Sequence, residues 1–285
     1  MIGLSARVRQ LELRARKSVS HIGAGAYRSA FKGLGIEFQE IREYSPGDDI
    51  RTIDWNVTAR HDRPYVKRYV EEREQTILLL VDGSASTHFK SKRESIAEIA
   101  ATLAYAAVLN HDKVGLILFT STVEAYMPPA GGLNQARRII RDICASYPRF
   151  PGTNIAGALQ FLERISPKRT FAFLISDFLA QQPSQQLRTT GRRHNLVALA
   201  VNDESEKSLP DGGLIQLEDP ESGTRMWLDT SDTKVRTQFA QLSLERDQAW
   251  TQALRAADVD RFPITAGEDY FPGLLRFLRA HANSR

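Results

Sequence analysis

An α/β fold with a doubly wound, mostly parallel sheet is predicted by three features of this sequence. Residues 77–81 are five consecutive apolar residues, the pattern of a strand buried on both faces. Comparable apolar runs follow at 114–119, 170–175 and 195–201. The segments between them repeat apolar residues every three or four positions, as amphipathic helices do. Strands that alternate with helices in this way are typical of a parallel sheet.

Composition supports a globular protein and excludes several classes. The chain has 285 residues, of which 42% are hydrophobic and 25% charged. The single cysteine, Cys144, excludes an intrachain disulfide and a cysteine-based zinc site, and we expect it to be a small core residue. No apolar run is long enough for a membrane span, and no signal peptide is recognisable at the N-terminus. We therefore expect a cytoplasmic protein.

The positive charge is concentrated at the N-terminus. The net charge is +4, and residues 1–20 carry five basic residues against Glu12 alone. The rest of the chain is neutral, so a global nucleic-acid-binding surface is not predicted. Residues 2–17 predict a basic helix, which we expect to pack on its own domain with a solvated basic face. Contact with an anionic membrane or a partner through residues 1–20 is the less favoured alternative.

Short strands and turns are predicted upstream of the first buried strand. The Gly-x-Gly pairs at 23–25 and 33–35 lack the third glycine of a dinucleotide fingerprint and do not follow a strand. No P-loop sequence is present either. Residues 45–48 (Ser-Pro-Gly-Asp) predict a turn, and residues 65–69 predict a short strand. We interpret the glycines as turn or bulge positions.

Helices and an edge strand are predicted after the first buried strand. Residues 91–94 (Ser-Lys-Arg-Glu) have the form of a capping box, and the following helix presents an apolar face within 96–108. Residues 122–127 predict an antiparallel edge strand that ends at Pro128-Pro129. Residues 134–147 predict the next helix.

The remaining elements follow the same alternation. Asn154 is expected to cap the helix that runs to residue 165. The later expected elements are a short helix from Ser184, a hairpin of 214–217 with 224–228, a helix over 231–257, a strand at 262–264 and a short helix around 274–278. We divide the chain into an N-terminal extension (1–73), an α/β domain (74–230) and C-terminal helices packed on that domain (231–285).

A candidate metal site follows the first buried strand. Asp82, Ser84 and Ser86 form a D-x-S-x-S motif of hard oxygen donors that suit Mg²⁺, Ca²⁺ or Mn²⁺. Alone, this motif also fits an ordinary strand-to-helix turn. Thr153 precedes a predicted helix and Asp177 follows a second buried strand. Because the carboxyl ends of parallel strands meet at one edge, these five residues are expected to converge there.

These five residues resemble the metal-ion-dependent adhesion site of von Willebrand factor A domains. The upstream segment resembles the signature of a bacterial family called domain of unknown function 58, and the resemblance covers about residues 20–230. The matching positions are Gly33-x-Gly35-x-Glu37-Phe38, Arg42-x-Tyr44, Gly47-Asp48-Asp49-x-Arg51-x-Ile53-Asp54-Trp55 and Val66-Lys67-Arg68. Within this signature, Arg51 lies among Asp48, Asp49 and Asp54, which favours structural ion pairs over a second metal site.

The resemblance implies a non-catalytic, metal-dependent interaction module. Ser84 and Ser86 would bind the metal directly, whereas Asp82, Thr153 and Asp177 would bind it directly or through water. The expected ion is Mg²⁺, with Mn²⁺ or Ca²⁺ as alternatives, and an open position would accept an acidic side chain of a partner.

Partner binding is also implied by the resemblance. We assign His88 and Asn154, which flank the ligands, to partner binding. Family members commonly pair with MoxR-type AAA+ ATPases, which implies an adaptor in assembly, maturation or stress response.

A metal-dependent hydrolase is the alternative function. In that case a metal-bound water between Asp82 and Asp177 would attack the substrate. The motif loops contain no histidine or glutamate placed as a general base, and Ser84 is not in a G-x-S-x-G elbow. A flat surface beside the metal would favour an adaptor, and a deep pocket would favour an enzyme.

Overall fold

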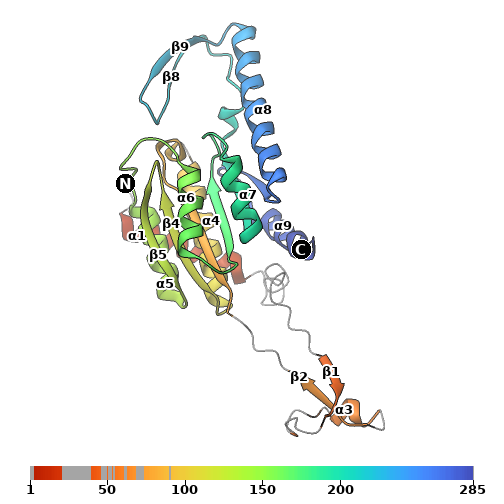
Figure 1. Cartoon of the computed structure of the whole chain (residues 1–285). Coiled ribbons are helices and arrows are strands. Elements are labelled where there is room, and N and C mark those ends of the chain that lie inside the picture. Colours follow the sequence, from red (N-terminus) through yellow and green to blue (C-terminus); the bar gives the residue numbers. More distant parts are fainter. Residues whose placement is uncertain are drawn as a thin grey trace.

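A six-stranded sheet with helices on both faces forms the body of the protein (Figure 1). The strands are β3 (Thr76–Asp82), β4 (Lys113–Phe119), β5 (Val123–Ala130), β6 (Phe171–Ser176), β7 (Asn195–Asn202) and β10 (Asp260–Thr265). Their order is β10-β7-β6-β3-β4-β5, and only β5 is antiparallel to its neighbour. The predicted α/β fold with a mostly parallel sheet is therefore confirmed. The computed structural model describes residues 3–20, 40–45, 50, 53, 55–60, 63–68, 74–89 and 91–284.

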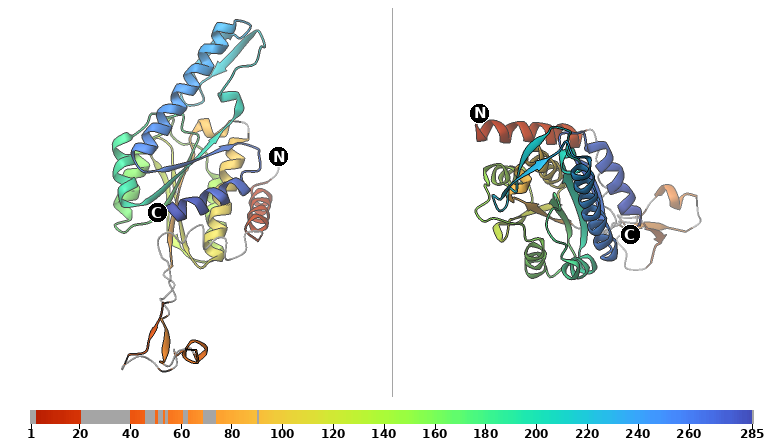
Figure 2. Two further views of the ribbon diagram at one scale, coloured as in Figure 1. Left: turned by 90° about the vertical axis from the view of Figure 1, so that its right-hand side faces the viewer. Right: turned by 90° about the horizontal axis from the view of Figure 1, so that it is seen from above.

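One face of the sheet is covered by two layers of helices. The helices are α1 (Leu4–Ser20), α4 (Lys92–Leu109), α5 (Leu133–Ala145) and α9 (Phe271–Ser284). α1 buries Leu11, Ala15 and Val19 and lies along the outer side of α4 (Figure 2). Since α4 is enclosed between α1 and the sheet, it is buried on almost every side. The apolar side of α1 is thus used inside this chain.

The other face carries a single layer made of α6 (Ile155–Ile165), α7 (Ser184–Arg193) and part of α8 (Thr233–Ala256). Trp250 and Leu254 of α8 are buried in this second core, where Trp250 packs edge-on against Phe178. The first half of α8 extends past the end of the sheet (Figure 1).

Two smaller strand pairs complete the described structure. β1 (Glu40–Glu43) and β2 (Tyr65–Arg68) form one antiparallel pair, with the short helix α3 (Trp55–Thr58) between them in sequence. β8 (Leu214–Glu218) and β9 (Arg225–Asp229) form the other. The turn of this second hairpin points back toward the upper end of the sheet in Figure 1. Among the described residues, no helix has both the length and the apolar character that a membrane span requires.

Two local predictions were wrong. Ser91 precedes α4, but its side chain makes no capping hydrogen bond, so there is no capping box. β5 continues through Pro128 and Pro129 to Ala130. Prolines are tolerated there because β5 is an edge strand, whose outer side needs no partner. Opposite them stands Gly115, where a Cβ atom would lie 2.8 Å from the Met127 carbonyl oxygen, so the close approach of the two strands requires glycine.

Candidate metal site

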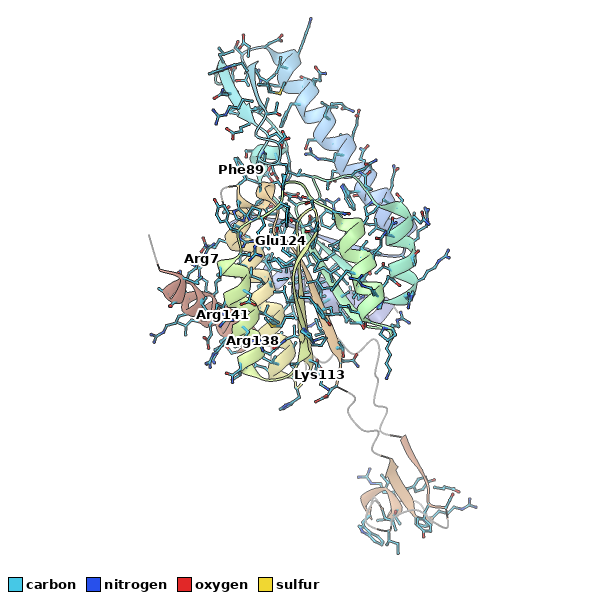
Figure 3. All side chains as sticks on the ribbon, turned by 60° about the vertical axis from the view of Figure 1, so that its left-hand side comes forward. Arg7, Phe89, Lys113, Glu124, Arg138 and Arg141 are labelled. Carbon is cyan, nitrogen blue, oxygen red and sulfur yellow. The ribbon has the colours of Figure 1, made fainter. Side chains whose placement is uncertain are left out.

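The carboxyl edge of the sheet carries the candidate site. Lys113, at the start of β4, and Phe89, after the short 3₁₀ helix η3 (Ala85–His88), mark the two ends of the sheet (Figure 3). Asp82 is the last residue of β3, and Ser84 and Ser86 follow it on the way into η3. Asp82 and Ser84 are fully buried.

The loop after β3 is held in place by hydrogen bonds that its backbone N–H groups donate. The Gly83 N–H donates to the Phe119 carbonyl at 2.8 Å, which ties the loop to the end of β4. The Ser84 N–H donates to Asp82 Oδ1 at 2.9 Å. The loop therefore folds back on the carboxylate and places both serine hydroxyls beside it.

The two serine hydroxyls are spaced as neighbouring metal ligands. Ser84 Oγ and Ser86 Oγ lie 3.2 Å apart. Octahedral Mg²⁺ binds oxygen at about 2.1 Å, so two adjacent ligands are separated by about 3.0 Å. The observed spacing fits a shared hard cation, because the two oxygens can occupy neighbouring corners of the octahedron.

Asp177 is brought to the same edge by the pairing of β6 with β3, in which Ile175 is opposite Val81. Asp177 is 2% exposed. The Ser176 hydroxyl donates to Asp82 Oδ2 at 2.6 Å, which links the two strand ends directly. The predicted convergence of Asp82 and Asp177 is thus present in the structure.

Two buried carboxylates at one edge create a negative site. Burial, and then the negative charge of Asp177, raise the pKa of Asp82 to about 7. A cation bound here would relieve that repulsion. Hydroxyl and carboxylate oxygens are also the donor types that hard divalent cations prefer, so the residues present fit Mg²⁺.

Lys92 is part of this site, and the sequence pattern did not reveal it. It lies in the first turn of α4, is 0% exposed, and donates to Asp177 Oδ2 at 2.7 Å and to Glu206 Oε1 at 2.5 Å. Burial lowers the pKa of Lys92, but the charges of Asp177 and Glu206 outweigh it and raise the pKa above its ordinary value. One oxygen of Asp177 is therefore occupied by an ammonium group, while its Oδ1 accepts from the Leu179 N–H at 3.2 Å.

Thr153 lies on the loop before α6. The Asn154 N–H donates to the Thr120 carbonyl at 2.8 Å, which ties this loop to the end of β4. The backbone N–H groups of Ser86 and Gly152 donate to the same carboxylate, that of Glu221, at 2.9 and 2.6 Å. The loop that carries Thr153 is therefore brought beside the serine loop, as the candidate site requires.

His88 and Asn154, the two residues assigned to partner binding, both have local contacts. Asn154 Oδ1 accepts from the Gly157 N–H at 2.8 Å and caps α6, while its Nδ2 donates to the Ser121 carbonyl at 3.2 Å. The His88 ring packs edge-on against Tyr147, with ring centroids 5.3 Å apart. Burial, followed by the positive charges of Arg93 and Arg7, lowers the pKa of His88 to about 4, so the ring is neutral at neutral pH.

The upstream signature is described only in part. Arg42 lies in β1, and Trp55 begins α3 and is 68% exposed. Asp48, Asp49, Arg51 and Asp54 lie outside the described residues, as do the Gly-x-Gly pairs at 23–25 and 33–35.

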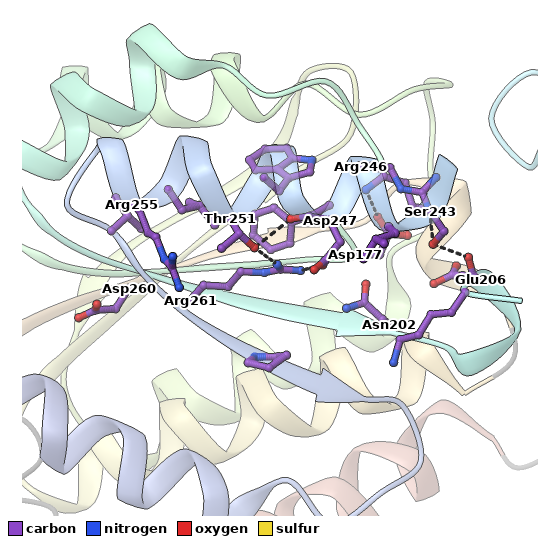
Figure 4. Close-up of a pocket in the computed structure, with 18 of the residues that line it drawn as sticks. Asp177, Asn202, Glu206, Ser243, Arg246, Asp247, Thr251, Arg255, Asp260 and Arg261 are labelled. Atoms are coloured by element: carbon purple, nitrogen blue, oxygen red, sulfur yellow. Dashed lines mark hydrogen bonds and ion pairs between the residues drawn. The ribbon is translucent and has the colours of Figure 1, made fainter. Parts of the chain in front are cut away.

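A cavity of about 610 Å³ begins beside Asp177 and runs between α8 and the strands β7 and β10 (Figure 4). One ion pair joins two of its lining residues: Arg261 donates to Asp247 at 2.5 Å, and also to the Thr251 hydroxyl at 2.7 Å. No histidine or cysteine lines it within the described part of the chain.

The described part of the chain also contains no group of three or more His, Cys, Asp or Glu side chains arranged to hold a metal.

A family model and curated relatives match this chain. The family model described as "Protein of unknown function DUF58" matches residues 40–249. "Uncharacterized protein Rv1480" of Mycobacterium tuberculosis is 29% identical over 283 residues, which is 96% of this chain and 89% of that protein. "Uncharacterized protein YeaD" of Bacillus subtilis is 28% identical over 76 residues, 27% of this chain and 18% of that protein.

Two solved structures are similar at lower identity. The conserved hypothetical protein BatB from Bacteroides thetaiotaomicron aligns with a TM-score of 0.48 and 14% identity, over 74% of this chain and 100% of that chain. Proximal thread matrix protein 1 from the mussel byssus, with a zinc-occupied MIDAS motif, aligns with a TM-score of 0.38 and 16% identity, over 45% of this chain and 38% of that chain.

Proposed function

This chain belongs to the family described as Protein of unknown function DUF58, and we propose that its α/β domain is a non-catalytic, metal-dependent protein-interaction module. The observation that carries the proposal is the serine hydroxyl pair, 3.2 Å apart and buried beside two carboxylates at one sheet edge. Such a set of oxygens suits a hard divalent cation, and we assign Mg²⁺, with Mn²⁺ or Ca²⁺ as alternatives.

Each residue has a distinct part in this proposal. Ser84 and Ser86 would hold the ion directly with uncharged oxygens, and Thr153 would complete the set from the neighbouring loop. Asp82 supplies negative charge from the end of β3. Asp177 already binds Lys92 through Oδ2, so we assign it a contact through water. The bound cation would supply an electrophilic position that a carboxylate of another protein can occupy.

The partner is proposed from the family resemblance. We propose a MoxR-type AAA+ ATPase that offers an acidic side chain, with this chain acting as a cytoplasmic adaptor in assembly, maturation or stress response. A membrane surface is the less favoured partner, because the apolar residues Leu11, Ala15 and Val19 of α1 are buried against α4 and α5. The basic side chain of Arg14 on that helix also donates to Glu98 at 3.0 Å.

A hydrolase is the second candidate, and the cavity beside Asp177 is the observation that favours it. Among the described residues that line it there is no histidine to act as a general base, and Asp247 is paired with Arg261. The Lys92 ammonium group also binds the Asp177 carboxylate that would have to orient a nucleophilic water. The adaptor function is therefore the better supported of the two.

Isothermal titration calorimetry with Mg²⁺, Mn²⁺ and Ca²⁺ tests the metal site. We expect saturable binding of at least one ion to the wild type and none to Asp82→Ala. Asp142→Ala is the control, because this aspartate lies on α5 and pairs with the adjacent Arg141 at 3.1 Å. Equal titrations of the wild type and Asp82→Ala would refute the metal site.

The partner is tested separately. A pull-down of a purified MoxR-type ATPase, with and without chelator, should show binding that needs the ion and Asp82. Binding that is insensitive to both the chelator and Asp82→Ala would contradict the proposed mode of interaction.

A further inference from the structure

A glutamate from a distant segment reaches the candidate site. Glu221 lies in the turn of the β8–β9 hairpin, and its two carboxylate oxygens accept hydrogen bonds from different loops of the site. Oε1 accepts from the Ser86 N–H at 2.9 Å and Oε2 from the Gly152 N–H at 2.6 Å. Ser86 is itself a candidate ligand, and Gly152 adjoins Thr153. The carboxylate therefore lies where the two ligand-bearing loops meet.

The turn is built to present this carboxylate. Asp219 organises it by accepting from the Glu221 N–H at 3.0 Å and from the Ser222 hydroxyl at 2.6 Å. The Gly223 N–H donates to the Asp219 carbonyl at 2.8 Å, and Gly223 has φ of 68°, a conformation that favours glycine. Glu221 is partly buried, whereas Ser222, Gly223 and Thr224 after it are exposed.

The rest of the hairpin is weakly attached to the domain. Its strands expose large apolar side chains, with Leu214 at 66%, Met226 at 54% and Trp227 at 62% exposed. Its base is fixed by the Thr230 N–H, which donates to the Gly213 carbonyl at 2.7 Å. Among the described residues, the Glu221 carboxylate ties the turn to both loops of the candidate site.

We propose that Glu221 is an internal acidic ligand of the site, which occupies the position meant for the acidic side chain of a partner. This inference rests on the proposed metal-dependent function. A carboxylate held by two backbone N–H groups makes charge-assisted hydrogen bonds, and a cation held by the candidate ligands would add a direct attraction for it. A partner must therefore displace Glu221. The apparent affinity of the partner then equals its intrinsic affinity multiplied by the fraction of molecules in which Glu221 has left the site.

Hydrogen exchange of the metal-free protein tests the contact itself. In Glu221→Ala, we expect the amides of Ser86 and Gly152 and the hairpin amides to exchange about tenfold faster than in the wild type, because their acceptor and the anchor of the turn are lost. The matched control is Glu218→Ala, on the same hairpin, whose carboxylate accepts from Arg225 of the paired strand at 2.7 Å. Equal exchange in the two variants would overturn the proposal. Unchanged far-UV circular dichroism confirms that both variants fold.

Mg²⁺ tests the ligand role. Saturating Mg²⁺ should slow exchange of the hairpin amides in the wild type but not in Glu221→Ala. In calorimetry, Glu221→Ala should bind Mg²⁺ about five- to tenfold more weakly than the wild type, because carboxylate ligands raise affinity for such ions. If Mg²⁺ binds the wild type but leaves hairpin exchange unchanged, the role of Glu221 is refuted and the metal site stands. If Mg²⁺ binds neither the wild type nor Glu221→Ala, the proposed function fails, and the metal-ligand role of Glu221 fails with it.

Discussion

The ends of β3 and β6 lie side by side and both carry a buried aspartate, but they are stabilised differently. At the end of β3, Asp82 accepts hydrogen bonds from neutral donors, the Ser84 N–H at 2.9 Å and the Ser176 hydroxyl at 2.6 Å. At the end of β6, Asp177 accepts from the ammonium group of Lys92 at 2.7 Å. Asp177 thus has a permanent counter-ion inside the protein, whereas within the described part of the chain no cationic side chain pairs with Asp82.

The difference shows how charge is divided in the site. When ionised, the three carboxylates of Asp82, Asp177 and Glu206 oppose the single ammonium of Lys92, which leaves a net charge of −2. A divalent cation would offset this excess of negative charge. Glu206 accepts from the same ammonium group as Asp177, so the positive charge of Lys92 is shared between two carboxylates.

Removing the ammonium group of Lys92, the counter-ion of Asp177 at the end of β6, should have the largest effect on stability. Lys92→Met leaves Asp177 and Glu206 close together without a cation, and breaking a buried ion pair in this way costs about 3–5 kcal/mol. We expect a loss of that size in the free energy of unfolding, measured with urea in the absence of metal. Added Mg²⁺ should recover more stability in this variant than in the wild type.

A surface lysine provides the control. Lys113 pairs with Glu74, and both side chains are about half exposed. Exposed pairs contribute about 0–1 kcal/mol, so Lys113→Met should change stability little. If Lys92→Met also lost less than about 1 kcal/mol, the ammonium group would not be the permanent counter-ion of Asp177.

Removing the charge of Asp82, at the end of β3, should leave the metal-free stability almost unchanged but abolish the stabilisation by Mg²⁺. Asp82→Asn removes one of two repelling buried charges, so we expect the metal-free stability to stay within about 1 kcal/mol of the wild type. Mg²⁺ at 100 times its dissociation constant should stabilise the wild type by about 2.7 kcal/mol and this variant not at all. Thermal unfolding with and without Mg²⁺ measures both. Equal stabilisation of the two proteins by Mg²⁺ would show that Asp82 is not a ligand.

The sequence predicted the sheet, and the convergence of most of the candidate site residues at its edge, because both follow local rules. Runs such as residues 77–81 have few alternatives to a buried parallel strand, and strand ends converge at one edge once the strands are parallel. The amino-acid sequence alone was therefore enough to place Asp82, Ser84, Ser86 and Asp177 together. The edge strand β5 was predicted too short, because the tolerance of Pro128 and Pro129 depends on its position in the sheet.

Lys92 and Glu221 could not be predicted in the same way. Their partners lie 85 and 135 residues away in the chain, at Asp177 and Ser86. Neither hydrophobic periodicity nor motif spacing predicts a contact between residues so far apart in the chain. For Lys92, the local pattern was misleading, because Ser-Lys-Arg-Glu resembles a capping box in which the lysine would be exposed. The burial of Lys92 is decided by the carboxylates that the sheet brings to it.

The loop before α6, which carries Thr153, allows a test with a smaller expected effect that separates protein stability from partner binding. Asn154 caps α6 through the Gly157 N–H, and loss of an N-cap costs about 1 kcal/mol. Asn154→Ala should lower the free energy of unfolding by that amount, whereas Asn154→Asp, which keeps an acceptor, should not. If Asn154 also contacts a partner, both variants should weaken metal-dependent binding of the MoxR-type ATPase. If Asn154→Asp binds as the wild type does, the role of Asn154 is confined to holding the loop that carries Thr153.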